Sequence, residues 1–398
     1  MSKTTDSTLA KGLIAREIVE FSSAEDLGAL LSEATSADRT VVPFGGRKSL
    51  VTGKPATVDV GLDMTSNSGV ISYAPADLTL SVKAGTTWAD LQATLAEQGQ
   101  TLPIDVPHPD KATVGGVVAT GFAGARKFRQ GSLRDLLIGC EFVRGDGLVA
   151  RAGGMVVKNV SGFEIPRFLH GSWGSLAVIT SVNLKVVPIA RAEATVLQTF
   201  DAVADAVQAG LSLAQTGLPL DAIAVVASQD RVVLATRCTG RERAVNAMAA
   251  ELISVATGDS SRLDGADSAN WWQATTDDFA GVDSVMQLAV SVGNEALPAL
   301  AKRISELSQD ARILVLPGSG SLRVQIGTKA NIDPAATFTA IADLVRSDDG
   351  SWVIEAAPES LRVDVDVWGD ADSGHATMTS IKRTFDPGQV LNRGRLFI

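Results

Sequence analysis

Two glycine-rich segments, separated by about 70 residues, most restrict the fold of this chain. The first, "PFGGRKS" at 43–49, follows a short apolar run. The second, "ATVGGVVATGFAGARK" at 112–127, places glycines among β-branched valines. Glycine in such a setting usually marks backbone that must come close to another group. We therefore expect both segments to be sites of close backbone approach, and the second to be too patterned for a flexible linker.

The residues around these segments predict a mixed α+β region. A helix is expected over 22–34, with a serine cap and a leucine stripe, and another over 88–98, capped by Thr87. A hairpin turn is expected at 145–147. Apolar or alternating runs predict strands over 40–44, 57–64, 78–85 and 174–188.

The composition changes after Pro188 and predicts a second region. A strand and an alanine-rich amphipathic helix over 191–215 are followed by two strand-like runs at 220–228 and 231–238. Another helix is expected over 240–256. This β-α-β-β-α order predicts an antiparallel sheet with its helices on one face, in a domain that begins near residue 190.

Charge and cysteine content exclude several classes of function. The formal net charge of −10 argues against nucleic acid as a partner, because such binding requires a basic face. Two cysteines are fewer than the four thiolates that usually hold an iron–sulfur cluster. The sequence has no recognisable secretory leader and no apolar run long enough to span a bilayer. We therefore expect a cytoplasmic protein that reaches a membrane only through a partner.

The residues of "PFGGRKS" leave the role of this segment open. A Walker A loop has its lysine directly after a glycine, whereas Arg47 here separates Gly46 from Lys48. The three-glycine pattern of a Rossmann fold is also missing from the first strand–turn–helix. The segment alone therefore predicts either a loop that binds a phosphate group or an ordinary turn.

Two further segments, "GSWGSLAVIT" at 171–180 and "FDPGQVLNRGRLF" at 385–397, complete four ordered motifs. Together the four resemble the motifs of the vanillyl-alcohol-oxidase-type flavoproteins, whose FAD domain is also called PCMH-type. The resemblance implies an α+β fold with a two-subdomain PCMH-type FAD-binding domain at 10–188. It further implies a second antiparallel-sheet and helix domain at 189–375, and a tail at 376–398 that returns to the flavin.

The same resemblance implies FAD, held without a covalent bond, as the cofactor. Glycine-rich backbone brings N–H donors close to a pyrophosphate, because no Cβ intervenes. The segment 173–179 would hold the adenosine end, and Asn392 would approach the isoalloxazine ring, although Arg393 stands where the family has proline. The implied cofactor-binding residues are Pro43, Gly45, Gly46, Arg47, Lys48, Ser49, Pro107, Thr113, Val114, Gly115, Gly116, Thr120, Gly121, Trp173, Gly174, Val178, Ile179 and Asn392.

Within the family, "PHPDKATVGGVVATGFAGARK" and "GGMVVKNVSGFEIPRFLHGSWGSL" resemble flavin-binding subunits of bacterial glycolate-oxidising complexes. This resemblance implies two partners: a sister FAD subunit that oxidises the 2-hydroxy acid, and an iron–sulfur subunit. Members that oxidise 2-hydroxy acids themselves usually carry an H-x-x-x-x-x-x-H pair that holds a metal. The three histidines here include no such pair, so we expect this chain to have no catalytic residue and no metal ligand.

Two alternatives to the subunit hypothesis stay open: a self-sufficient 2-hydroxy-acid dehydrogenase that binds the carboxylate with an arginine, and a flavin-free scaffold. Two local roles are open as well. His108 could hydrogen-bond the cofactor or stiffen a proline-flanked turn. Arg126, Lys127 and Arg129 form either a solvated basic turn or a contact with a partner or the pyrophosphate. His375 is expected to be an exposed polar residue.

Overall fold

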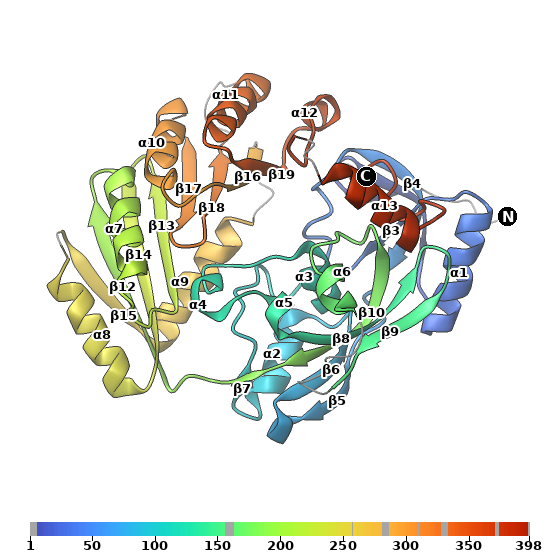
Figure 1. Ribbon diagram of the computed structural model, residues 1–398, viewed down its shortest axis with the longest axis horizontal. Coiled ribbons are helices and arrows are strands. Elements are labelled where there is room, and N and C mark those ends of the chain that lie inside the picture. The colour runs from blue at the N-terminus through green and yellow to red at the C-terminus, as the bar shows by residue number, and fades with distance from the viewer. Residues whose placement is uncertain are drawn as a thin grey trace. The chain divides into compact units, whose positions relative to one another are not determined.

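A computed structural model describes residues 6–155, 163–256, 258–280, 286–308, 310–327, 333–370 and 374–396 (Figure 1). The chain divides into two units, each with its own core. Unit 1 contains the residues up to Phe122, Ser132–Ile189 and the residues after Asp370. Unit 2 contains Ala123–Gly131 and Ala190–Asp370. None of the helices described combines the length and the apolar character that a bilayer crossing requires.

The first sheet of unit 1 is small and mixed. Its strands are β1 (Ser7–Ala10), β2 (Leu13–Val19), β3 (Val41–Phe44) and β4 (Ala56–Asp63), in the order β1-β2-β4-β3. The crossover α1 (Ala24–Ser36) begins after Ser23, whose hydroxyl accepts from the N–H of Asp26. Its leucine stripe is buried against β3 and β4, so the predicted helix is confirmed with its start two residues later.

The second sheet of unit 1 is antiparallel and carries the larger core. Its strands are β5 (Val70–Ala74), β6 (Thr79–Lys83), β8 (Leu137–Arg144), β9 (Val149–Gly153) and β10 (Ala177–Lys185), in the order β5-β6-β10-β8-β9. Helix α3 (Val114–Thr120) packs on β6 and β10, and α2 (Trp88–Ala96) buries Trp88, Leu91 and Leu95 in the same core. The remaining elements are the 3-10 turn η1 (Pro75–Asp77), β7 (Gln100–Thr101), α5 (Leu133–Leu136), α6 (Ile165–Leu169), β11 (Val187–Pro188) and α13 (His375–Phe385).

Unit 2 is built on one antiparallel sheet of eight strands, in the order β15-β12-β14-β13-β17-β18-β16-β19. The first half consists of β12 (Ala192–Phe200), α7 (Val203–Gln215), β13 (Ala222–Ser228), β14 (Arg231–Gly240), α8 (Glu242–Ser254) and β15 (Ser260–Asp264). The second consists of β16 (Met286–Ser291), α10 (Leu297–Leu307), β17 (Ala311–Leu316), β18 (Ser321–Ile326), α11 (Pro334–Ser347) and β19 (Ser351–Ala356).

The two halves therefore repeat one β-α-β-β-α-β motif. They join edge to edge through β13 and β17, where Val225 pairs with Val315. Between them lies α9 (Gly265–Asp278), and α12 (Glu359–Asp364) follows the second half. The predicted β-α-β-β-α order and antiparallel sheet are confirmed, and the structure adds a second copy of that order.

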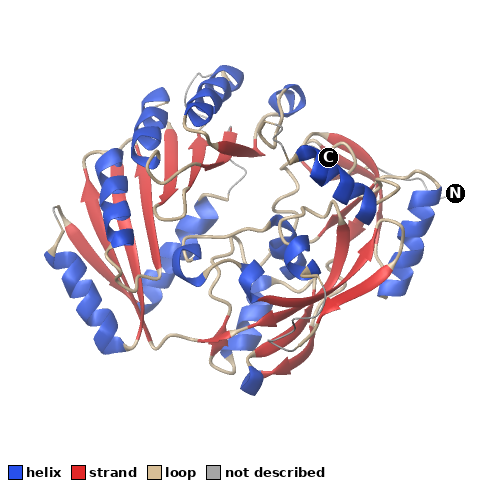
Figure 2. Ribbon diagram, in the orientation of Figure 1, coloured by secondary structure: helices blue, strands red, loops and turns tan. Residues whose placement is uncertain are grey.

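Helices cover both faces of this sheet, so the expectation of one covered face was wrong (Figure 2). Helices α7, α8, α10 and α11 pack on one face. On the other face Trp272 and Phe279, from α9 and its C-terminal end, pack on alternate residues of β13, β14 and β17. Ala125 joins this second cluster, which brings a segment from the middle of unit 1's sequence into unit 2.

That segment, 123–131, contains α4 (Lys127–Gln130) and is held by charge. Arg126 lies 3.2 Å from the buried carboxylate of Asp221 and 3.4 Å from Glu193. Gln130 donates to the same Asp221 at 2.6 Å. Arg126 therefore has an ion-pairing role within unit 2, whereas the side chain of Lys127 is exposed.

Candidate cofactor site

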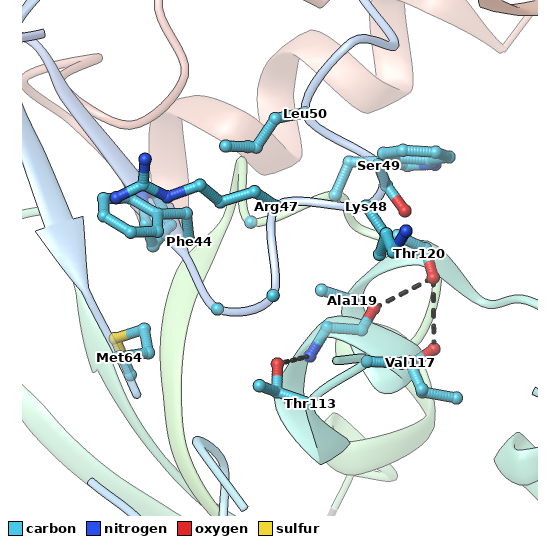
Figure 3. A pocket seen from close by; sticks show the side chains of 18 of the residues that line it. Phe44, Arg47, Lys48, Ser49, Leu50, Met64, Thr113, Val117, Ala119 and Thr120 are labelled. Atoms are coloured by element: carbon cyan, nitrogen blue, oxygen red, sulfur yellow. Dashed lines mark hydrogen bonds between the residues drawn. The ribbon is translucent and has the colours of Figure 1, made fainter. Parts of the chain in front are cut away.

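Unit 1 contains a deep pocket between its two glycine-rich segments (Figure 3). The empty space is about 1130 Å³, a volume that includes the open mouth and the solvent in it. Four stretches of chain form most of its walls: the loop 43–52, helix α3 with the residues before it, the strand entry 173–179, and the tail 392–396. Segments far apart in the sequence therefore meet around this one pocket.

The loop after β3 presents backbone N–H groups to this pocket. Within the described residues, the N–H groups from Gly45 to Ser49 donate to no protein acceptor. Arg47 has a φ of +59°, and its guanidinium lies 4.5 Å from the centre of the Phe44 ring (Figure 3). Successive free N–H groups around a left-handed residue form a concave site for anions. The loop is thus suited to a pyrophosphate.

Glycine is required at 45 and 46 because the loop lies directly against the second segment. A Cβ on Gly45 would be 2.2 Å from the hydroxyl oxygen of Thr113. A Cβ on Gly46 would be 1.8 Å from the carbonyl oxygen of Lys111. The two predicted sites of close approach are therefore in contact with each other, at the pocket.

The N-terminus of α3 is already occupied by protein acceptors. The N–H of Val114 donates to the carbonyl of Thr86 at 2.9 Å, and that of Gly115 to the carbonyl of Ala84 at 2.7 Å. The N–H of Gly116 donates to the hydroxyl of Thr113, which caps the helix (Figure 3). These amides are not free for a phosphate, although Gly115 and Gly116 line the pocket. The free donors lie in the loop instead.

Most of the implied cofactor residues line this one pocket. They are Pro43, Gly45, Gly46, Arg47, Lys48, Ser49, Pro107, Thr113, Gly115, Gly116, Thr120, Trp173, Gly174, Val178, Ile179 and Asn392. Val114 and Gly121 do not line it. Val114 is fully buried in the core of the second sheet. Gly121 ends α3 with a φ of +66° and faces the chain at His170 and Gly171.

Asn392 joins two walls of the pocket. Its side-chain amide donates to the carbonyls of Trp173 and Gly174, both at 3.1 Å. Trp173 and Asn392 both have positive φ, at +54° and +52°. These bonds place the backbone at 173–174 beside Asn392, although the two were assigned to opposite ends of the cofactor from sequence. One part of a bound ligand therefore faces both.

Arg395 lines the pocket as well, although it is not among the predicted cofactor-binding residues. Its side chain is buried and donates to the carbonyls of Leu50 at 2.5 Å and Thr52 at 2.7 Å, and to Asn392 at 3.2 Å. Arg395 is the final arginine of the closing motif "FDPGQVLNRGRLF". Its place in that motif is the sequence feature that could have identified it as a pocket residue. The other residues missed are mostly apolar and include Phe44, Met64, Val106, Val117 and Phe122.

A buried ion pair lies behind the tail. Lys382, from α13, is 3% exposed, and its ammonium lies 2.6 Å from the carboxylate of Asp386. It also donates to the carbonyls of Ser175 at 2.7 Å and Leu391 at 2.8 Å. Burial lowers the pKa of Lys382 from its ordinary value, and the charge of Asp386 opposes that shift.

The histidines lie apart from this chemistry. His108 is not among the lining residues; it has a φ of +47°, and its carbonyl accepts from the N–H groups of Lys111 and Ala112. It thereby shapes the turn that leads into α3. His375 is half-buried at the start of α13, in unit 1. The "KNVSG" part of the segment "GGMVVKNVSGFEIPRFLHGSWGSL", at 158–162, lies outside the described residues.

Comparisons with known proteins agree with this geometry. Residues 15–162 match the model of a family described as FAD binding domain. The loop's free amides and the room beside them fit that cofactor. Alkyldihydroxyacetonephosphate synthase, at 17% identity, superposes with a TM-score of 0.69 over 94% of this chain and 75% of its own, which shows a common fold.

Three relatives share part of the sequence. Glycolate oxidase subunit GlcE of Escherichia coli is 37% identical over 41% of this chain and 46% of its own length. A D-lactate dehydrogenase of Archaeoglobus fulgidus is 30% identical over 51% of this chain and 46% of its own. Glycolate oxidase subunit GlcD of Bacillus subtilis is 26% identical over 46% of this chain and 39% of its own. The aligned region spans less than half of each relative.

Proposed function

We propose that this chain, whose residues 15–162 match the model of the FAD binding domain family, is the flavin-binding subunit of a complex that oxidises glycolate to glyoxylate. The observation that carries the proposal is the pocket, with uncommitted N–H groups from Gly45 to Ser49 on one wall. The 37% identity to a glycolate oxidase subunit supports this choice of substrate.

The chain's own residues would bind and orient the cofactor. The loop amides receive the pyrophosphate, Thr113 and Thr120 line the wall beside them, and Asn392 fixes the turn at 173–174. Bound FAD accepts two electrons and can release them singly or together. Apolar side chains such as Met64 and Val106 exclude water from the inner wall. The protein thus supplies position and a dry surface.

The site of substrate oxidation is assigned to a partner chain. In the described residues no three histidine, cysteine or carboxylate side chains gather where they could hold a metal ion. The metal-assisted removal of a hydroxyl proton therefore lacks its ligands in this part of the chain. We infer a sister FAD subunit that oxidises the 2-hydroxy acid, and an iron–sulfur subunit that passes its electrons to quinone. The complex would be cytoplasmic and meet the membrane through its other subunits.

The test is the visible spectrum of the purified chain, before and after anaerobic addition of glycolate. We expect a yellow protein whose absorbance does not bleach, because the hydride donor site lies in the partner. Addition of the partner subunits should then allow glycolate to bleach it. A folded, colourless chain that takes up no added FAD would overturn the proposal and favour a scaffold.

A second candidate is a self-sufficient 2-hydroxy-acid dehydrogenase. The match to a D-lactate dehydrogenase over 206 residues favours it. In that case glycolate or D-lactate alone would bleach the isolated chain, and an artificial electron acceptor would sustain turnover.

A further inference from the structure

Lys382 uses all three N–H bonds of its ammonium group, and two of them reach residues that lie next to the walls of the pocket in the chain. One bond reaches the carboxylate of Asp386, one the carbonyl of Ser175, and one the carbonyl of Leu391. Ser175 directly follows the turn at 173–174, and Leu391 directly precedes Asn392. A single buried side chain therefore ties together the two stretches of backbone that meet at this end of the pocket.

Asp386 completes the connection from the other side. Its two carboxylate oxygens accept the N–H groups of Val390 at 3.1 Å and Leu391 at 2.9 Å. A Cβ on Gly145 would be 2.0 Å from this carboxylate, so the strand end of β8 packs directly on it. The ion pair is thus fixed by the core of unit 1 and in turn fixes the chain at 390–391.

Beyond this point residues 390–396, which end in the pocket-lining tail at 392–396, reach strand β3 and the loop that follows it. The N–H of Val41 donates to the carbonyl of Val390 at 2.8 Å, and the N–H of Asn392 donates to the carbonyl of Val41 at 2.9 Å. Arg395 then holds the carbonyls of Leu50 and Thr52. The position of the tail therefore sets the position of both Asn392 and the far end of the loop.

We propose that Lys382 is a positioning residue for the cofactor: it locks the tail against the turn at 173–175 and so determines the affinity for FAD without contacting it. The proposal rests on FAD binding at the pocket. An ammonium suits this role because its three donors diverge toward three separate acceptors, whereas the planar fork of arginine does not match them. Methionine has a similar length and removes every donor.

The experiment compares Lys382→Met with two controls in the full chain. Arg383→Met removes the neighbouring charge of the same helix, where the side chain is exposed. Leu95→Ala removes a fully buried side chain of α2 and lowers stability away from the tail. FAD affinity is measured by quenching of flavin fluorescence, and amide hydrogen exchange is measured on the FAD-free proteins.

We expect Lys382→Met to raise the Kd for FAD by about 10–100-fold, by analogy with the loss of affinity on mutating residues that orient metal ligands. Exchange should accelerate at 173–176 and 389–396 in the FAD-free protein. Arg383→Met should change neither, and Leu95→Ala should lower the melting temperature with less than a threefold change in Kd.

Unchanged FAD affinity in Lys382→Met would overturn the proposal, as would an equal loss in a Leu95→Ala protein of matched stability. Wild-type protein that fails to bind FAD would instead overturn the proposed function, and the exchange comparison would still report whether Lys382 holds the tail.

Discussion

Gly46 has no room for a side chain, because a Cβ there would meet the carbonyl oxygen of Lys111 at 1.8 Å. Because that oxygen belongs to the backbone, it cannot move away by a change of side-chain rotamer. Gly46→Ala must therefore displace the loop that carries the free N–H groups. We expect the variant to lose about 1–3 kcal/mol of stability and to bind FAD at least about tenfold more weakly. The measurements are urea unfolding and a fluorescence titration with FAD.

The matched control for this substitution is Gly154→Ala in the same unit. A Cβ at Gly154 would find nothing within 4 Å, and its φ lies outside the left-handed region. This control should bind FAD like the wild type. Equal affinity of both variants would contradict the close packing of loop 43–49 against residues 111–113.

Cys140 is buried in the second sheet of unit 1, and burial raises the pKa of its thiol from 9.0 to about 12. Between these values the unfolded chain releases a proton that the folded chain retains. The free energy of unfolding should therefore fall with rising pH, starting near pH 9, by up to about 1.4 kcal/mol per pH unit. Urea unfolding of unit 1 at pH 8 and pH 10 should show a larger loss in the wild type than in Cys140→Ala. Equal losses would mean that the thiol ionises normally in the fold.

The N-terminus of α3 shows how one cap serves both a helix and a site. The Thr113 hydroxyl accepts from Gly116, and the same side chain supports Gly45 of the loop. Thr113→Ala should cost about 1 kcal/mol of stability and should weaken FAD binding, because the loop loses its support. Thr87→Ala removes the equivalent cap of α2, whose hydroxyl accepts from Asp90, and should cost similar stability with FAD affinity unchanged. Equal FAD affinity in the two variants would show that the Thr113 side chain caps α3 without supporting the cofactor site.

The elements that the sequence predicted well have local causes. Ser23 and Thr87 cap their helices through their own hydroxyls, and the hairpin at 145–147 forms where its glycines lie. The sequence predicts a close backbone approach at 112–127 but not helix α3, because its glycines disfavour a helix. The acceptors of its first amides, Thr86 and Ala84, lie some 30 residues away along the chain and could not be inferred from local sequence.

The pocket was largely predictable for a different reason: its residues fall within ordered motifs that carry the family resemblance. Arg395 and the apolar wall were missed because their roles follow from tertiary contacts. Arg395 acts on Leu50 and Thr52, which are more than 300 residues distant in sequence. The repeat in unit 2 was missed because its two halves share a topology and a burial pattern rather than a sequence motif. The covered second face was missed because it depends on tertiary packing of α9 on β13 and β14.

Two cores in one chain predict two unfolding transitions. A ligand of unit 1 alone stabilises that unit by about 2.7 kcal/mol at 100 times its Kd. FAD should therefore move one calorimetric transition upward and leave the other in place. Arg126→Ala should lower the melting temperature of the other transition, that of unit 2. The substitution leaves the buried Asp221 without its ion pair, at a cost of about 1–3 kcal/mol. Lys127→Ala, at an exposed neighbour, should move neither. One transition shifted by both FAD and Arg126→Ala would show that the chain unfolds as a single cooperative system.

The tail that closes the pocket lies 346 positions after Ser49 at Arg395, and this separation has a consequence for biosynthesis. At the usual pace of about 5–20 residues per second, a ribosome needs about 20–70 s to travel from one wall to the other. Throughout that interval the nascent loop has its open amides but neither Asn392 nor Arg395 beside it. The complete pocket can therefore form only after the tail has emerged from the ribosome.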